Sequence, residues 1–203
     1  MKVELHLHTS RHSDCATSSP HELMRRLIEC GYGAVYLTEH DQMWDEWELA
    51  DLRAHYPEIL IFPGVEIALG ENRAQHLVVL GTADRDYLRI PTAGGIIAHA
   101  REQHHLTILA HPFRWPASPP EILLGPVLPD AVEHRTCNTP PGADVQAAEA
   151  AHRLGLPTVN SGDVHALEMT NRFWIETFEA LVDPDDIFSV VRSRAYRNGP
   201  QST

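Results

Sequence analysis

Histidines and carboxylates gather in a few short patches of this 203-residue chain. Most patches come directly after a run of apolar residues, where a buried strand would end. In chain order they are His6-Leu7-His8, Asp14, Thr38-Glu39-His40, Gly64-Val65-Glu66, Ala110-His111-Pro112 and Gly162-Asp163-Val164-His165, and His76 stands at the start of a further apolar run. A parallel β/α barrel delivers side chains from the ends of its strands to one rim. Neutral imidazoles and carboxylates suit zinc, iron or manganese, so the pattern predicts a metal centre at such a rim.

His6 and His8 stand two residues apart at the end of an expected strand. Side chains alternate along a strand, so a His-x-His sequence sends both rings to one face, where they can bind one ion. A buried histidine pair can also be purely structural, and the pair alone does not decide between the two interpretations. Similar residues recur at the ends of other expected strands, and this recurrence favours metal binding.

The elements that must position these residues alternate between strand and helix. Strands are expected at residues 2–7, 34–38, 59–62, 77–80, 107–110, 131–133 and 157–160, with residues 63–67 as a turn and short strand. Helices are expected after an N-cap at Ser19, over residues 44–55, 96–103 and 144–154, and from Pro184 to Arg194 with Asp183 as N-cap, and the long loop at 112–129 has room for one more short helix. This alternation predicts a single α/β domain with a mostly parallel sheet, folded as a small or distorted barrel. A doubly wound open sheet is the competing architecture.

Composition narrows the classes of partner. The formal net charge is −12, which argues against a nucleic-acid-binding surface. No apolar run approaches the ~20 residues that span a bilayer, so no membrane partner is expected. The N-terminus runs directly into a strand-like segment without signal-peptide organisation, which predicts a cytoplasmic protein. The three cysteines are irregularly spaced and indicate neither a disulfide framework nor a zinc ribbon.

The set of motifs, in this order, resembles the polymerase and histidinol phosphatase (PHP) family, from about residue 3 to residue 165. The resemblance implies a distorted (β/α)7 barrel, a single domain over residues 1–203, and a site with two or three divalent ions (Zn, Mn or Fe) that hydrolyses phosphoesters. Carried over position by position, the first ion would be held by His6, His8, Glu66 and Asp163. The second would share Glu66 and add His76 and His111, and the third would take Asp14, His40 and His165. Glu133 matches a family position with a carboxylate near the site.

Two departures from the family pattern affect the third ion. Asp14 comes six residues after His8, one more than is common in the family, so His12 is a rival ligand. The chain also has Glu39 where an aspartate is common. This carboxylate is compatible with the pattern if it orients His40 rather than binding metal.

The predicted chemistry is attack by a metal-activated hydroxide on a phosphoester. Glu66 would set the spacing of the ions, and His40 or His165 could stabilise the leaving group when not ligating. Arginine forks suit phosphate. Arg114, three residues after His111, is the first candidate for substrate binding, and Arg11 is the second.

The expected substrate is a small phosphorylated metabolite or nucleotide. Within the same fold the alternatives are a 3′–5′ exonuclease and a protein-tyrosine phosphatase, and the acidic charge counts against the exonuclease. A non-catalytic metal-binding barrel is the alternative of another class. Hydrolysis of a C–N bond is a further possible enzymatic activity. It is weakened because such sites often use a metal-bridging lysine, and the only lysine here is Lys2.

Overall fold

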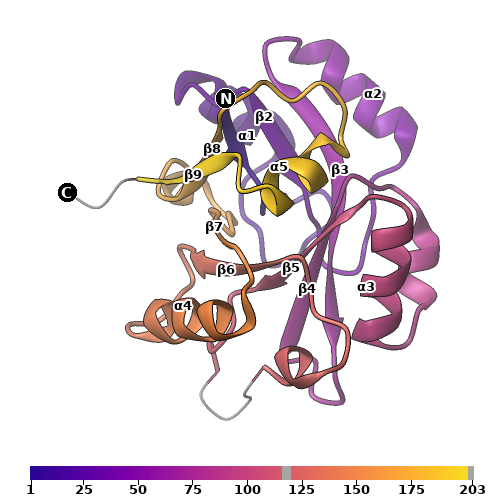
Figure 1. The fold of residues 1–203 in the computed structure, drawn as a ribbon. Helices are drawn as coiled ribbons and strands as arrows, with labels where there is room; N and C mark the ends of the chain where they lie inside the picture. Colours follow the sequence, from indigo (N-terminus) through magenta and orange to yellow (C-terminus); the bar gives the residue numbers. More distant parts are fainter. Residues whose placement is uncertain (116–119, 201–203) are drawn as a thin grey trace.

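A nine-stranded sheet dominates the computed structural model, which describes residues 1–115 and 120–200 (Figure 1). Its strands are β1 (Lys2–Glu4), β2 (Ala34–Leu37), β3 (Leu60–Leu69), β4 (Gln75–Leu80), β5 (Leu106–Ala110), β6 (Ala131–Arg135), β7 (Thr158–Asn160), β8 (Trp174–Thr177) and β9 (Tyr196–Gly199). The α-helices are α1 (Pro20–Glu29), α2 (Glu46–His55), α3 (Ala93–Glu102), α4 (Ala143–Leu154) and α5 (Asp186–Arg192), and short 3₁₀ turns are η1 (Arg85–Arg89), η2 (Glu121–Leu124) and η3 (Leu167–Met169). Residues 116–119, inside the loop expected at 112–129, lie outside the described residues. None of the described helices is long and apolar enough to cross a membrane.

The sheet is nearly closed into a barrel. Its strand order is β7-β6-β5-β4-β3-β2-β1-β8-β9, and side chains join the two outermost strands. Asn160 of β7 donates from its backbone N–H to Asn198 Oδ1 at 2.7 Å and from Nδ2 to the Gly199 carbonyl at 3.1 Å. Tyr196 of β9 donates to the Thr158 carbonyl at 2.7 Å. The predicted distorted barrel is therefore confirmed, and an open doubly wound sheet is excluded.

The sheet is mixed rather than mostly parallel as expected, because β4 and β8 run against their neighbours. β4 pairs antiparallel with both β3 and β5, whereas β1, β2 and β3 are parallel, as are β5, β6 and β7. β3 is also longer than expected, because Pro63 lies inside it and the chain continues extended to Leu69. The reversal puts the start of β4 at the same rim as the ends of the parallel strands.

Apolar clusters fill the barrel and cover its outer face. Inside, strand residues such as Val3 and Ile108 pack with Ile187 and Val191 of α5, so α5 closes the end of the barrel where the parallel strands begin. α1 and α2 pack on one part of the outer face and α3 and α4 on another, and α2, α3 and α4 are seen around the sheet in Figure 1. The opposite end, where the parallel strands finish, is left for polar side chains.

Local hydrogen bonds explain where some elements begin and end. Ser19 caps α1 in a capping box with Glu22 and Pro20 opens the helix, as expected. The strand expected at 2–7 stops at Glu4, because the Glu4 carboxylate accepts the backbone N–H groups of residues 5 and 6. The last helix begins at Asp186 rather than Pro184. Its N-cap is Asp185 rather than the expected Asp183. The carboxylate of Asp186 turns back and accepts the N–H groups of residues 182 and 183.

Candidate metal centre

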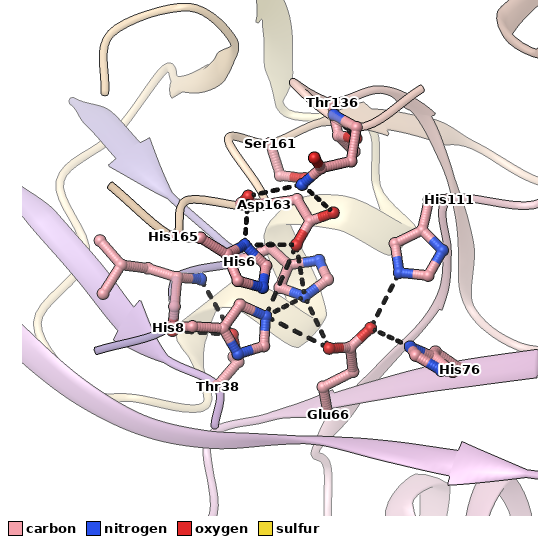
Figure 2. Close-up of polar contacts among 12 residues, drawn as sticks. His6, His8, Thr38, Glu66, His76, His111, Thr136, Ser161, Asp163 and His165 are labelled. Atoms are coloured by element: carbon pink, nitrogen blue, oxygen red, sulfur yellow. Dashed lines mark hydrogen bonds and ion pairs between the residues drawn. The ribbon is translucent and has the colours of Figure 1, made fainter. Parts of the chain in front are cut away.

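A bridge between two chain segments brings four of the predicted ligands together. Leu7 and Val164 form an isolated parallel β-bridge, with His8 N–H donating to the Val164 carbonyl at 2.8 Å. Both apolar side chains belong to the cluster on the outer face. Because side chains alternate, the residues on either side of each point inward. These four inward residues are His6, His8, Asp163 and His165 (Figure 2).

The first ligand set consists of two imidazole nitrogens and two carboxylate oxygens. His6 Nε2 and His8 Nε2 lie 3.0 Å apart, and each lies 3.2 Å from Glu66 Oε2. Asp163 Oδ1 is 3.6 Å from His6 Nε2 and 3.5 Å from His8 Nε2. All four side chains are buried. The structure thus brings together the complete set predicted for the first ion.

The second set meets the other oxygen of the same glutamate. Glu66 Oε1 lies 2.7 Å from His76 Nδ1 and 3.0 Å from His111 Nε2. His111 follows the end of β5, whereas His76 lies at the start of β4 and reaches the same rim because that strand is antiparallel. The two oxygens of Glu66 therefore face two different groups of histidines, as seen in Figure 2.

A third group forms around His8 but lacks the predicted Asp14. Ligand atoms of His8, His40 and His165 lie within 4.8 Å of one another, and His40 Nδ1 also lies 2.8 Å from Glu66 Oε2. Asp14 is exposed and belongs to none of the candidate ligand groups found among the described residues.

The loop after His8 explains why Asp14 is left out. The Ser13 N–H donates to the Thr9 carbonyl at 3.0 Å, and this turn directs Ser13 inward. The Ser13 hydroxyl donates to Glu39 at 2.6 Å and accepts the His40 N–H at 3.3 Å. The rival ligand His12 instead lies 3.1 Å from Glu48 and away from the histidine group. In this structure Asp14 therefore lies outside the candidate ligand groups, and its role as a ligand stays a prediction.

The burial and charge of the cluster fit divalent cations. Glu66 Oε2 and Asp163 Oδ1 are buried and receive no well-directed hydrogen bond from the described residues, although imidazole nitrogens surround them. Burial raises the pKa of both carboxyls, but His6 and neighbouring histidines outweigh it, and both pKa values lie well below normal. Both groups are therefore ionised, and convergent lone pairs of this kind are what a cation requires.

Residues outside the predicted ligand sets hold the ligands in place. Glu133 Oε1 lies 2.8 Å from His6 Nδ1, and Glu133 Oε2 accepts the His111 N–H at 2.6 Å. Asn138 donates from Nδ2 to Asp163 Oδ2 at 2.8 Å. Sequence reasoning noted Glu133 as a carboxylate near the site but missed Asn138, which lies in a loop without a motif around it.

Glu39 supports the site without binding His40 directly, because its carboxylate contacts Thr9, Ser13 and Trp44. It accepts the Thr9 N–H at 3.0 Å, the Thr9 hydroxyl at 2.6 Å and the Trp44 indole N–H at 3.0 Å. It reaches His40 through Ser13, as described above. It therefore fixes the loop beside His8 and does not face the ligand sets.

Two ligands lie in an unusual backbone conformation. His111 has φ 26° and Asp163 has φ 47°, in the left-handed region that most residues avoid. Such conformations cost about 1–3 kcal/mol and concentrate at functional sites. The preceding Gly162 is required for space, because a Cβ there would lie 2.3 Å from Val164 Cγ2 and 2.6 Å from Glu4 Oε2.

The two predicted substrate-binding arginines occupy different places. Arg114 Nη1 lies 3.5 Å from Asp163 Oδ2, so its half-buried guanidinium borders the cluster, and it lies over the Trp115 ring at 5.0 Å. Arg11 Nη2 instead lies 2.7 Å from Glu48 Oε1, in a pocket with Trp44. The structure brings Arg114 to the site and leaves Arg11 turned away from it.

Comparison with known proteins finds similarity in structure only. No protein-family model matches the chain. No curated protein sequence matches it either. Among solved structures, a two-domain protein from Bacteroides vulgatus that contains a predicted PHP-like metal-dependent phosphoesterase aligns with a TM-score of 0.70 and 18% identity. That alignment covers 98% of this chain, which spans 64% of the Bacteroides protein.

Two further solved structures align over nearly their whole length. A proposed metal-dependent phosphoesterase from Bifidobacterium adolescentis aligns with a TM-score of 0.66 and 13% identity over 95% of this chain and 96% of its own. An amidohydrolase from Chromobacterium violaceum aligns with a TM-score of 0.63 and 15% identity over 99% of both chains. These similarities confirm, at the level of the fold, the resemblance that the motifs predicted: the chain has the barrel fold of the PHP-like metal-dependent phosphoesterases.

Proposed function

We propose that this protein is a metal-dependent hydrolase that cleaves a phosphoester of a small phosphorylated metabolite or nucleotide. The proposal rests on the surroundings of Glu66, whose two buried oxygens face two separate groups of histidines. A carboxylate placed in this way is suited to bridge two divalent ions. Such pairs of ions are used to clamp both the attacking and the leaving oxygen in phosphoryl transfer.

Different residues of the cluster would bind the two ions and the substrate. His6, His8, Asp163 and one oxygen of Glu66 would hold one ion, and the other oxygen with His76 and His111 would hold a second. When bound, the ions would supply an activated water and neutralise charge on the phosphoryl oxygens. Arg114 would bind a phosphoryl oxygen at the rim, because its guanidinium is half-buried beside Asp163 and provides a fork of N–H donors.

His165 presents a neutral ring that is suited to bind an ion. Burial, helped by the neighbouring His8, lowers its pKa to about 4, so the ring is neutral at pH 7. Its Nδ1 lies 3.0 Å from the Asp163 carbonyl oxygen, which can only accept, so Nδ1 carries the proton and Nε2 keeps a lone pair. His40, half-buried beside Glu66, is the other candidate for a third ion or for stabilising the leaving group. Neither role requires Asp14.

A second candidate function is hydrolysis of a C–N bond, and the likeness to the amidohydrolase from Chromobacterium violaceum favours it. The absence of a lysine near the centre counts against it, because the only lysine, Lys2, is placed between the rings of Tyr32 and Trp174. Exonuclease activity is disfavoured by the acidic charge, since single-strand channels are basic. Phosphotyrosine peptides remain an alternative substrate class.

The test combines metal analysis with turnover. We expect about two or three divalent ions per chain and hydrolysis of p-nitrophenyl phosphate that increases when manganese is added. The variant His8→Ala should lose bound metal and the hydrolytic activity. The exposed His152 provides the matched control, since His152→Ala removes an imidazole far from the cluster. Metal without turnover of any phosphoester would instead favour a non-catalytic barrel or a different scissile bond. No metal after reconstitution would contradict the proposal.

A further inference from the structure

A second polar pocket lies at the end of the barrel opposite the metal centre. It has a volume of about 490 Å³ and is lined by Arg101 at the end of α3, Asp130 just before β6 and Arg192 at the end of α5. The five-residue strand β5 separates the two ends, with Thr107 beside this pocket and His111 in the metal centre. Four residues of extended chain span about 13 Å, so the pocket and the metal centre are separate sites.

Asp130 is the buried anchor of this pocket. Its Oδ2 accepts the Thr107 N–H at 3.1 Å and the Thr107 hydroxyl at 2.7 Å. Its Oδ1 accepts from Arg192 Nη1 at 2.5 Å and from Arg101 Nη2 at 3.5 Å. One carboxylate with two hydrogen bonds from Thr107 needs only one cation for neutrality, and Arg192 is the closer. Arg101 is therefore in excess at this carboxylate.

The two guanidiniums keep donors available. Arg101 uses only Nη2, for Asp130 and the Leu128 carbonyl, and Arg192 uses only Nη1. The Nε and one Nη group of each arginine have no acceptor among the described residues. The side chains are 43% and 46% exposed, so these donors are accessible. Asp130 is the one carboxylate among the described residues that line the pocket, which leaves a local charge of about +1 in a chain of net charge −12.

The remaining walls are apolar and stiff. Val127 and Leu156 line the pocket together with three prolines. A proline has no N–H and a fixed φ, so these walls provide shape and apolar surface but no competing donors. Most small-molecule sites combine apolar walls with a few converging polar groups in this way.

We propose that this pocket binds the phosphoryl group of a small phosphorylated molecule, with a short apolar part against Val127 and Leu156. A phosphoryl group matches the N–H forks of the two arginines in geometry, and its negative charge is attracted by the excess positive charge of the pocket. The site is independent of the metal centre and of the reaction proposed there. Simple neutralisation of Asp130 would explain Arg192 but leaves the exposed donors of Arg101 without a role.

The test is a phosphate titration of the ¹⁵N-labelled full chain, as purified with its metal, observing the arginine Nε–H signals by NMR. We expect the signals of Arg101 and Arg192 to shift together and saturate, with an apparent Kd of about 1 mM or lower, and propyl phosphate to bind more tightly than inorganic phosphate. Chloride at equal ionic strength should leave them in place. His8→Ala should not change the titration, which separates this site from the metal centre.

Two variants complete the test. Arg101→Met should weaken binding at least tenfold, and Arg101→Lys should do so while keeping the charge beside Asp130, because the fork is lost. Arg89→Met is the matched control, since Arg89 is exposed and paired with Asp86 on the surface. Shifts that never saturate, a uniform drift of all arginine signals, or unchanged affinity in Arg101→Lys would overturn the proposal.

Discussion

Glu133 and His6 form a buried pair in which the carboxylate fixes the direction of the imidazole. Glu133 Oε1 lies 2.8 Å from His6 Nδ1, so Nδ1 carries a proton and Nε2 faces Glu66 and Asp163, where it would bind an ion after losing its own proton. The same carboxylate accepts the His111 backbone N–H and the Ser161 hydroxyl. One side chain thus orients members of both ligand sets.

Glu133→Gln should lower metal affinity about 10- to 100-fold, as loss of a partner that orients a ligand typically does. The amide of glutamine has one acceptor oxygen, so it cannot accept from His6, the His111 N–H and Ser161 as two carboxylate oxygens do. A competitive chelator titration measures the affinity. Glu149→Gln, an exposed control on α4, should leave it unchanged. Equal affinities in the two variants would contradict the orienting role.

Arg114→Met should reduce kcat/KM for a phosphoester about 10- to 150-fold, the value of one charge-assisted hydrogen bond of about 1.5–3 kcal/mol. Metal content should stay the same, because Arg114 binds no ion. Steady-state kinetics with the metal-loaded protein measure the effect.

Arg11→Met is the control for this prediction, since Arg11 is held by Glu48 in a different pocket. Its kcat/KM should stay within about twofold of the parent, because its guanidinium lies beside Glu48 and does not border the cluster. A larger loss in Arg11→Met than in Arg114→Met would reverse the assignment of the two arginines.

Asp14→Ala should leave the number of bound ions and the activity unchanged, because Asp14 is exposed and outside the ligand groups. His165→Ala should reduce activity and, if a third ion binds, lose that ion. Elemental analysis of the two variants in parallel decides this. Loss of an ion in Asp14→Ala would restore Asp14 as a ligand and require the loop after His8 to rearrange on metal binding.

The position of ligands at strand ends could be predicted because strands and apolar runs coincide. Glu66 and His111 follow buried stretches, and the barrel brings such positions to one rim. His76 was placed in the set by family resemblance alone. Its location at the start of a strand makes sense only with an antiparallel β4, and strand direction depends on pairing between distant segments, which one sequence does not show.

Other features depend on single hydrogen bonds and could not be predicted. The outward position of Asp14 depends on the turn that points Ser13 inward toward Glu39. Asn138 binds Asp163 from a loop that carries no motif. The hairpin of β8 and β9 was missed because its strands are short and β8 includes polar residues, and it is defined by pairing with β1.

Gly162→Ala should destabilise the fold by about 1–3 kcal/mol, the usual cost of forcing atoms into a packed core. The new methyl would overlap Val164 and the Glu4 carboxylate, which accepts the Gly162 N–H at 2.7 Å. Metal affinity should fall as well, because Asp163 follows directly. Denaturant unfolding measures the stability.

Gly94→Ala is the matched control on α3. A Cβ there meets only Val127 Cβ at 4.0 Å, and alanine favours a helix. Its stability should be unchanged or raised by up to about 1 kcal/mol. A fold that tolerates Gly162→Ala as well as Gly94→Ala would show that the close packing beneath Asp163 is not required.

Metal binding at pH 7 should release about one or two protons per chain, as is typical when protonated ligands must be freed. Burial lowers the pKa of His6, but Glu133, Glu66 and Asp163 raise it more, so it lies well above the usual value, and the pKa of His8 is raised by Asp163 and Glu66 in the same way. The raised pKa values favour the protonated rings before metal binds, whereas a cation binds only the neutral form. Affinity should rise as pH increases toward these raised pKa values and fall as pH decreases.

Calorimetric titration with metal in two buffers of different ionisation enthalpy measures the released protons. His165→Ala should release the same number, because the pKa of His165 is lowered to about 4 and its ring is already neutral at pH 7. Identical binding enthalpies in the two buffers would mean that His6 and His8 are neutral before the metal arrives. In that case the carboxylates around them would not be raising their pKa values, and the charge balance derived for the cluster would be wrong.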